Sequence, residues 1–504
     1  MFEGGDKMKK GNKVLAMFLA AVMLVTSIAW DFGDAAVAEA ETTSAITKTD
    51  DSLSIDFDNI DVAELDAAGY TSTRFKSSAA IAGEVNRKVS EHWFAGDGED
   101  TLYTTGNGTN ATGKNIGLKS NDINEAGTRT VMYTGCSYED FTVSAEIYYG
   151  AYSGIVIGEK NVYPTESSDA SSVAIFFNSG RLHIVGAVDR DSANIMRGSS
   201  AAIANNGNAV GYKIFNNGSG DTIKTKAGTA YTVNVKKTGN HLLIWYSGGT
   251  GLISIKLTES YKTGAIGIQS KCYDGDAGGF KSLSIEKVHA VESQMLEGKT
   301  MQELDDLAYS ASMGSTLKLN SVGDAFFSGT SGYVYGSTTT TITSANNGLK
   351  GRATGGSIAG LNIPYVYENF RLEAELYHGQ VTGISIGSQS GSASVGSTST
   401  KTINLYFNGA VMEACGAIQA KSASVVKGEG YSSSSASSDT MYKLTTKDTA
   451  GTAYKEVKDA KVTLIVEVKN GMFTMGMKDY SGYVSIPVAS GFTTEKISLI
   501  SRQK

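Results

Sequence analysis

The sequence contains one pattern twice, about 230 residues apart. YEDFTVSAEIYYG at residues 138–150 returns as YENFRLEAELYHG at residues 367–379, an offset of 229. Further matches keep this order while the offset drifts to 231, ending with IGIQS at 266–270 and ISLIS at 497–501. Order and spacing held over this length indicate a duplicated module, and the period is too long for a solenoid repeat. Each copy is therefore expected to bury its own core.

The duplication predicts the domain organisation. We expect a signal peptide at 1–40, a first domain at 41–288 and a second domain at 289–504, joined by a short polar segment. The first copy continues for eighteen residues beyond the last match, whereas the second continues for three. An open edge where a core-closing strand belongs is costly. We therefore expect the second domain to lack its last strand and the chain to be part of a longer extracellular protein.

Apolar and polar residues alternate within each copy, which is the period of a β-strand. Residues 141–148 alternate, with Phe141, Val143, Ala145 and Ile147 apolar and the residues between them polar or tyrosine. Residues 370–377 repeat this alternation. Similar runs at 231–235 and 242–246 are separated by a Gly-containing turn. The chain has 59 Gly, 25 Tyr and only three Pro, which suits many short strands and tight turns. The sequence predicts an all-β chain with two tandem antiparallel β-sandwich domains.

The first forty residues are typical of a bacterial-type export signal. A basic stretch at 7–13 precedes an apolar run at 14–30 and a small-residue site, Ala38-Glu39-Ala40. The apolar run is shorter than the roughly 20 residues that a spanning helix needs. We therefore predict cleavage before Glu41, no membrane span in the mature chain, and an extracellular location, either secreted or at the cell surface.

The stretch at 231–288 resembles the C-terminal half of concanavalin A-like lectin/glucanase domains, the jelly-roll sandwiches related to laminin-G modules. In that family a V-x-V strand leads through a hairpin to a G-x-I-G-L strand and then to a closing F-x-x-V-x-V strand. Here GAIGI at 264–268 is similar to the former, and Phe280, Leu283 and Ile285 to the latter. The resemblance implies a jelly-roll fold in both copies. It leaves lectins, adhesion modules and glycosidases open, because the fold hosts all three.

Charge and motifs argue against several classes of function. A formal net charge of −7 does not suit a nucleic-acid partner. The five histidines show no metal-binding spacing, and no G-x-S-x-G elbow or phosphate-binding loop is present. Cys136, Cys272 and Cys415 are too few and too scattered for a disulfide framework or a zinc site.

Sugar binding requires exposed aromatic faces that stack on sugar rings, together with a few polar groups. One strand carries a glutamate and a tyrosine on its solvent face in both copies, and a cross-strand surface contact would explain this pairing equally well. Further aromatic residues extend this surface or pack in the core. The predicted ligand-binding residues are Glu146, Tyr148, Tyr152, Trp245, Glu375 and Tyr377, with Tyr163 and Trp93 as further candidates.

Catalysis and calcium binding have weaker support. Glycosidases of this fold use two carboxylates on one strand face. The glucanase signature E-x-D-x-x-E is absent, and Glu373 and Glu375 come nearest to it, although a solvated strand face explains them as well. The family resemblance implies a structural calcium ion. Asp274 and Asp276 in DGDAGG offer oxygen ligands, as ordinary turn-forming aspartates also would.

The sequence favours a secreted carbohydrate-binding or adhesion protein whose partner is a polysaccharide or a cell-surface glycan. One alternative is a glucanase-like glycoside hydrolase that uses carboxylates on the concave face. The other is a structural spacer with no ligand. Duplication favours binding or spacing, because enzymes seldom carry the same degenerate face twice.

Signal cleavage is directly testable. Because a small-residue site follows the apolar run, N-terminal sequencing of secreted protein should begin at or near Glu41. Recovery of a chain with an intact Met8 start from the membrane fraction would contradict this prediction.

Overall fold

The computed structural model describes the chain from Ala45 to Arg502, with gaps. The residues outside this description are 1–44, 77, 97–99, 105–109, 115–116, 122–127, 149–151, 165–169, 179–180, 199–202, 206–210, 215–229, 248, 271–278, 330–332, 338–339, 345, 354–355, 380, 428–432, 458 and 503–504. The predicted signal peptide, Cys272, Asp274 and Asp276 fall in these gaps. Residues 45–504 form one compact unit.

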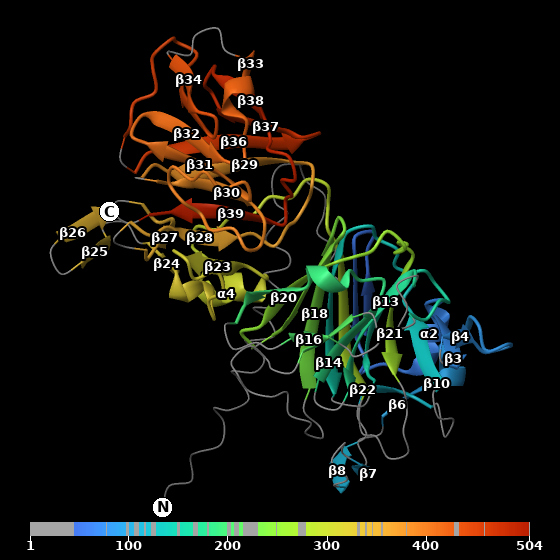
Figure 1. Cartoon of the computed structure of the whole chain (residues 1–504). Coiled ribbons are helices and arrows are strands. Elements are labelled where there is room, and N and C mark those ends of the chain that lie inside the picture. Colours follow the sequence, from blue (N-terminus) through green and yellow to red (C-terminus); the bar gives the residue numbers. More distant parts are fainter. Residues whose placement is uncertain are drawn as a thin grey trace, which may run out of the picture. The chain divides into compact units, whose positions relative to one another are not determined.

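Two ten-stranded antiparallel sheets make up the first sandwich (Figure 1). Sheet 1 has the order β1 (Ile46–Lys48), β2 (Ser52–Asp56), β22 (Gly279–Lys287), β11 (Phe141–Tyr148), β18 (Ala230–Thr238), β19 (His241–Tyr246), β20 (Leu252–Lys256) and β15 (Asn194–Arg197), with β9 (Leu118–Ser120) and β6 (Trp93–Ala95) attached beside β22. Sheet 2 has the order β16 (Ile203–Asn205), β17 (Gly211–Ile214), β14 (Arg181–Gly186), β13 (Ser172–Asn178), β12 (Gly154–Gly158), β21 (Ala265–Ser270), β10 (Thr128–Tyr133), β3 (Thr71–Lys76) and β4 (Ala79–Ala80), with β5 (Arg87–Lys88) on β3.

The second sandwich has one eight-stranded and one five-stranded sheet. Sheet 3 has the order β23 (Ser310–Met313), β28 (Ala359–Asn362), β39 (Lys496–Ser501), β30 (Gly383–Gly387), β31 (Thr402–Asn408), β32 (Val411–Gly416), β35 (Met441–Thr445) and β34 (Ser433–Ser438). Sheet 4 has the order β29 (Phe370–Tyr377), β36 (Lys461–Lys469), β37 (Met472–Met477), β38 (Tyr483–Pro487) and β33 (Ser424–Lys427). The all-β, antiparallel sandwich fold predicted from the alternation is confirmed.

Short elements complete the described part of the chain. Three two-stranded sheets pair β7 (Asp100–Thr104) with β8 (Asn110–Lys114), β24 (Phe326–Ser328) with β27 (Leu349–Gly351), and β25 (Tyr333–Ser337) with β26 (Thr340–Ser344). The helices are α2 (Val62–Ala67), α3 (Val89–His92), α4 (Met301–Asp306) and the 3-10 turns η1 (Arg190–Ser192), η2 (Val322–Asp324) and η3 (Ala420–Ser422). Both α2 and α4 begin with a capping box, in which Glu64 and Glu303 reach back to the first backbone N–H.

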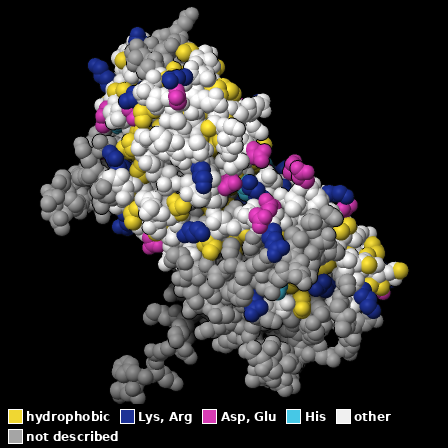
Figure 2. All heavy atoms as spheres, in the orientation of Figure 1, with side chains coloured by type: hydrophobic (Ala, Val, Ile, Leu, Met, Phe, Trp, Pro, Cys, Tyr) yellow, Lys and Arg dark blue, Asp and Glu magenta, His cyan; other side chains and the backbone are white. Residues whose placement is uncertain are grey.

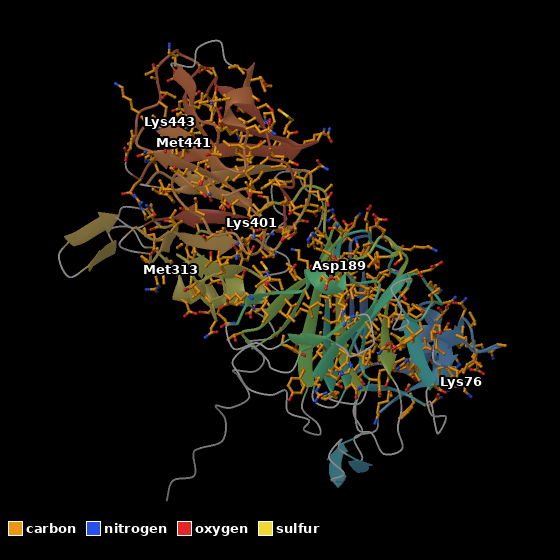
Figure 3. All side chains as sticks on the ribbon, in the orientation of Figure 1. Lys76, Asp189, Met313, Lys401, Met441 and Lys443 are labelled. Atoms are coloured by element: carbon orange, nitrogen blue, oxygen red, sulfur yellow. The ribbon has the colours of Figure 1, made fainter. Side chains whose placement is uncertain are left out.

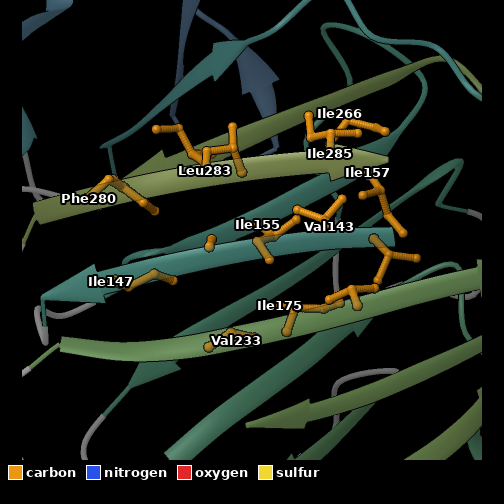
Figure 4. Close-up of a cluster of buried hydrophobic side chains, with 14 of the residues drawn as sticks. Val143, Ile147, Ile155, Ile157, Ile175, Val233, Ile266, Phe280, Leu283 and Ile285 are labelled. Carbon is orange, nitrogen blue, oxygen red and sulfur yellow. The ribbon is translucent and has the colours of Figure 1, made fainter. Parts of the chain in front are cut away.

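The core of each sandwich comes from alternate residues of both its sheets, as the period of two requires. In the first sandwich, Val143 and Ile147 of β11 and Leu283 and Ile285 of β22 meet the apolar side chains of sheet 2 (Figure 4). All four are fully buried. Burial of side chains of this size contributes roughly 1.5 to 3 kcal/mol each.

The apolar side chains of β29 are more exposed than those of its counterpart β11. The two strands match at an offset of 229 and have the same apolar positions. On β11, Phe141, Val143 and Ile147 are at most 1% exposed. On β29, the equivalent Phe370, Leu372 and Leu376 are all partly exposed. In the described part of sheet 4, β29 pairs with β36 alone, whereas β11 pairs with β18 and with β22.

A buried ion pair joins the two halves of the sequence. Arg197 of β15 is 1% exposed and lies 2.9 Å from Asp305 Oδ1 at the end of α4. The guanidinium also donates to the backbone oxygens of Thr250, Asp305 and Tyr309, at 3.0, 2.8 and 2.6 Å. Burial works against both charges, since it lowers the pKa of Arg197 and raises that of Asp305. The dense set of acceptors offsets this desolvation.

The difference between β11 and β29 predicts unequal mutational costs. Ile147→Ala opens a cavity in a closed core and should lower the free energy of unfolding by about 2 to 5 kcal/mol. Leu376→Ala removes a partly exposed side chain and should cost about 1 kcal/mol or less, because little apolar area is lost. Urea unfolding of both variants beside the unchanged chain measures the two values. Equal losses would mean that the apolar face of β29 is covered as well as that of β11.

Candidate functional site

An aromatic and polar patch lies on the outer face of sheet 2, the face turned away from the sandwich core. Ile266 and Ile268 of β21 point into the core, so Gln269 points outward. The same alternation puts Arg129 of β10 and Phe176 of β13 on the outer face. We define the patch by the residues Arg129, Tyr152, Tyr163, Phe176, His183 and Gln269.

Arg129 lies between two tyrosine rings. Its guanidinium carbon is 4.7 Å from the ring centre of Tyr163 and 5.3 Å from that of Tyr152. Tyr152 stacks on Phe176 with ring centres 5.4 Å apart, and Phe176 stacks on His183 at the same distance. The result is a row of ring faces with one cation above it. Cation–π contacts of this kind contribute about 0.5 to 2 kcal/mol, more when they are desolvated.

The floor of the patch carries polar atoms with unmet hydrogen bonds. Gln269 is fully buried and donates from Nε2 to the backbone oxygen of Tyr152 at 3.1 Å. The Tyr163 hydroxyl interacts with the Gln269 side chain, which lowers the pKa of Tyr163, but this hydroxyl, Gln269 Oε1 and Arg129 Nε make no well-formed hydrogen bond to the described residues. Burial raises the pKa of Tyr163 to about 12, against the opposing charge of Arg129, so the hydroxyl stays protonated at neutral pH. Buried polar atoms left unpaired cost about 1 to 3 kcal/mol each, which calls for an explanation.

The second sandwich fills the same three positions with aliphatic residues. At the repeat offsets, Arg129, Tyr152 and Gln269 correspond to Ile358, Val381 and Ile500. These three residues are 2–4% exposed and pack with Tyr406 and Cys415, and Met441, labelled in Figure 3, lies against them.

The backbone at this point is the same in both copies. Tyr152 and Val381 share a left-handed conformation, with φ of 62° and 58°. The fold therefore accepts aliphatic residues at these three positions. The positions of Phe176 and His183 hold Tyr406 and Glu413 in the second copy, and the Tyr406 hydroxyl donates to Glu413 at 3.1 Å.

The predicted Glu–Tyr pairs are engaged in local contacts. Glu146 lies 2.7 Å from Lys281 Nζ, and the hydroxyl of the buried Tyr148 donates to Asp58 at 2.9 Å. Burial raises the pKa of Asp58, against the hydrogen bond from Tyr148 that lowers it. These contacts are the cross-strand alternative that the sequence left open.

In the second copy the corresponding residues are more exposed. Glu375 lies 2.9 Å from Lys461 Nζ, and that ammonium group is 5.3 Å from the centre of the Tyr377 ring. Glu373 lies 2.8 Å from the guanidinium of its neighbour Arg371. Both carboxylates are therefore paired with cations on an open strand face.

The remaining predicted aromatic residues lie apart from one another. Tyr152 and Tyr163 belong to the patch, whereas Trp245 is 4% exposed and packs with Leu243, Leu252 and Ala308 beside sheet 1. Trp93 is buried and donates from Nε1 to Ser72 Oγ at 3.0 Å. The structure thus brings Tyr152 together with Tyr163 and with neither tryptophan. Arg129 and Gln269 were not predicted from the sequence, although a position-by-position comparison of the two copies would have singled them out.

The structure gives no support to a metal site within its described residues. There, no group of three or more His, Cys, Asp or Glu side chains is placed to hold an ion. Asp274 and Asp276 lie outside the description, so the calcium hypothesis remains a prediction. Asp189, labelled in Figure 3, accepts the backbone N–H of Asp191 at 3.0 Å and so acts as a turn former.

The described part of the surface in this view has no block of one charge. Acidic and basic side chains are interspersed on the face drawn in Figure 2. No helix in the described part of the chain has the length and apolar character needed to cross a membrane.

Comparison with known proteins yields matches to solved structures alone. No family model and no curated sequence matches the chain. The chain is similar to the VIP36 exoplasmic/lumenal domain bound to Ca²⁺ and Man3GlcNAc, with 10% identity, 34% of this chain and 80% of that chain covered, and a TM-score of 0.21. It is also similar to carbohydrate-binding module CBM66 from Bacillus subtilis, with 12% identity, 39% of this chain and 96% of that chain covered, and a TM-score of 0.19. A third match is to mouse laminin alpha1 domains LG4-5, with 11% identity, 73% of this chain and 77% of that chain covered, and a TM-score of 0.18.

With every one of these TM-scores below 0.25, these likenesses carry no information on a binding site, whose chemistry depends on the residues of this chain.

Proposed function

We propose that the first sandwich binds carbohydrate at the patch formed by Arg129, Tyr152, Tyr163, Phe176, His183 and Gln269. The observation that carries the proposal is the difference between the copies. Arg129, Tyr152 and Gln269 stand where Ile358, Val381 and Ile500 satisfy the same backbone. Arg129 Nε and Gln269 Oε1, which lack a well-formed hydrogen bond to the described residues, are costly in a position that the fold can fill with isoleucine. A ligand that takes up those hydrogen bonds offsets this cost.

The chemistry of the patch suits a sugar. Arg129 and Tyr152 are partly exposed and so can meet a ligand, whereas Tyr163 and Gln269 are buried beneath them. Aromatic faces stack on the C–H face of a sugar ring, and guanidinium, amide and phenol groups bond its hydroxyls.

We extend the proposal to a role outside the cell. Export of the chain by its first forty residues would present the patch to polysaccharide or to glycans of another cell, as a secreted or surface-attached adhesion protein requires. We do not extend it to hydrolysis, since Glu373 and Glu375 are each paired with a cation on an exposed strand.

The proposal is tested by replacing patch residues with the residues that the second copy has at the same positions. A glycan array probed with the mature chain, with and without EDTA, identifies the ligand and any need for calcium through Asp274 and Asp276. Arg129→Ile, Tyr152→Val and Gln269→Ile should each weaken binding of that glycan by about tenfold or more, because each removes one or more bonds of about 1 to 3 kcal/mol. The melting temperature should hold or rise, because the sister copy accepts these residues.

Matched controls lie on the other predicted surface. Glu146→Gln and Glu375→Gln alter exposed or half-buried ion pairs of the strands β11 and β29 and should leave glycan binding unchanged. If these two variants lose binding while the patch variants keep it, the site belongs to the Glu–Tyr strands and the patch proposal is wrong.

A further inference from the structure

A polar pocket lies between the outer face of sheet 1 and loops of the second sandwich. Its volume is about 440 Å³, within the range of about 300 to 1,000 Å³ that small-molecule sites occupy. The first copy lines this pocket with the turn η1 and the strands β15, β19 and β20. The second copy lines it with residues that follow β23 and β30 and with Glu495, just before β39. The lining has no residue in common with the patch around Arg129.

Two side chains of the first copy line the pocket from neighbouring strands. Leu242 of β19 and Ile255 of β20 point into the core, so the adjacent residues His241 and Lys256 point outward. His241 and Lys256 are directly opposite each other in the ladder between the two strands. An imidazole and an ammonium group are therefore held side by side on a rigid sheet.

The second copy places a carboxylate beside the ammonium group. Lys256 Nζ lies 3.4 Å from Glu495 Oε1, and both side chains are partly exposed. Gln389 holds Glu495 in place, because its backbone N–H donates to Oε2 at 3.1 Å and its Nε2 donates to the Glu495 backbone oxygen at 2.6 Å. An ammonium group has three N–H donors, and a carboxylate oxygen accepts more than one bond. Both groups can therefore bond a further partner.

His241 is the buried group that lacks a partner. It is 3% exposed, and neither Nδ1 nor Nε2 has a hydrogen-bond partner within the described part of the chain. Burial lowers the pKa of His241 to about 4, with Lys256 acting in the same direction and Glu495 against it. The imidazole is therefore neutral at neutral pH, so one ring nitrogen donates and the other accepts. Leaving both unpaired in a buried position is costly.

The second copy has no such pair at the equivalent positions. His241 and Lys256 correspond to Met472 and Pro487, which are opposite each other in the ladder between β37 and β38. The backbone thus accepts an apolar methionine where the first copy has His241. The imidazole is therefore not required by the fold, and its unpaired nitrogens call for a ligand.

We propose that this pocket binds a small uncharged polyol, such as a monosaccharide, at a site separate from the patch. Each hydroxyl of a polyol donates and accepts, and the neutral imidazole of His241 also does both. Lys256 adds donors and Glu495 adds acceptors. Because His241 and Lys256 come from the first copy and Glu495 from the second, the bound polyol bridges the two sandwiches.

The charges of the pocket favour a ligand without net charge. Its described lining carries two acidic side chains, Asp191 and Glu495, and two basic ones, Lys256 and Lys318. An anion would meet the carboxylates, and a cation would meet the ammonium groups. A metal ion suits the pocket less well, because protein metal sites commonly use three or more ligands. No His, Cys, Asp or Glu group of that size is placed to hold an ion in the described residues.

The probes are D-glucose, D-galactose, D-mannose and myo-inositol, each titrated into the full chain. At least one of them should shift the ring-nitrogen NMR signals of His241 to saturation, because a bound hydroxyl supplies the missing hydrogen bonds. The His241 signals are identified by their loss in His241→Met. The titration is repeated in the Arg129→Ile chain, so that the patch cannot supply the response. Failure of the patch proposal leaves this readout untouched, since it reports on His241 alone.

Variants test the two polar groups by calorimetry of the same probe. His241→Met and Lys256→Met should each weaken binding by about tenfold or more, because each removes hydrogen bonds to the ligand. His289→Met and Lys262→Met are the matched controls, since both lie outside the pocket and are half-exposed or exposed, and they should leave the affinity unchanged. The melting temperature of His241→Met should hold or rise, because the second copy has methionine at this position.

Three results would overturn the proposal. The first is the absence of a saturable shift of the His241 ring signals with all four polyols. The second is a response to sodium phosphate or glycine that exceeds the response to every polyol, which would make the ligand a charged one. The third is polyol binding that His241→Met and Lys256→Met both leave unchanged.

Discussion

The structure depends on one constraint, which is that an alternating strand has an apolar face that must be covered from the opposite sheet. Alternate residues of β11 and β18 meet sheet 2 in the first sandwich, and β22 does the same on either side of one bulge. The same period governs sheets 3 and 4 in the second sandwich. Where the cover is complete, as at Val143, the side chain is fully buried. Where a neighbouring strand is missing from the described sheet, as beside β29, equivalent side chains face a hollow.

Much of the fold could be predicted from the sequence, because the alternation of apolar residues and the duplication are both properties of the order of residues along the chain. The run at 141–148 and its repeat at 370–377 predicted strands that the structure places at Phe141–Tyr148 and Phe370–Tyr377. The candidate site was harder to predict. Arg129 and Gln269 come from β10 and β21, which pair in the sheet although they are distant in the sequence, and no local motif marks them. The sequence also did not show which side chains are exposed. Tyr148 falls on the polar face of the alternating strand and is nonetheless buried.

The two copies explain each other because they solve one packing problem with different residues. On the outer sheet face, Ile358, Val381 and Ile500 pack in the second copy at the positions of Arg129, Tyr152 and Gln269, and this difference is what motivates the proposed binding site. At the sheet edge, β11 pairs with strands on both sides in the first copy, whereas β29 pairs with β36 alone among the described residues. In a duplicated chain, each residue of one copy can thus be compared with the residue that the other copy has at the equivalent backbone position. This is physical evidence of a different kind from residue similarity, since it concerns what the same backbone tolerates.

The buried Arg197 carries a practical consequence for any dissection of the chain. Its guanidinium donates to Thr250 on one side and to Asp305 and Tyr309 on the other. A cut between residues 288 and 289 would leave an arginine without its counter-ion in one fragment and a carboxylate without its cation in the other. The thermodynamic stabilities of the two fragments would then not add up to that of the intact protein, because neighbouring groups that share partners are energetically coupled. Calorimetry of separate halves would measure this lost coupling together with their intrinsic stability.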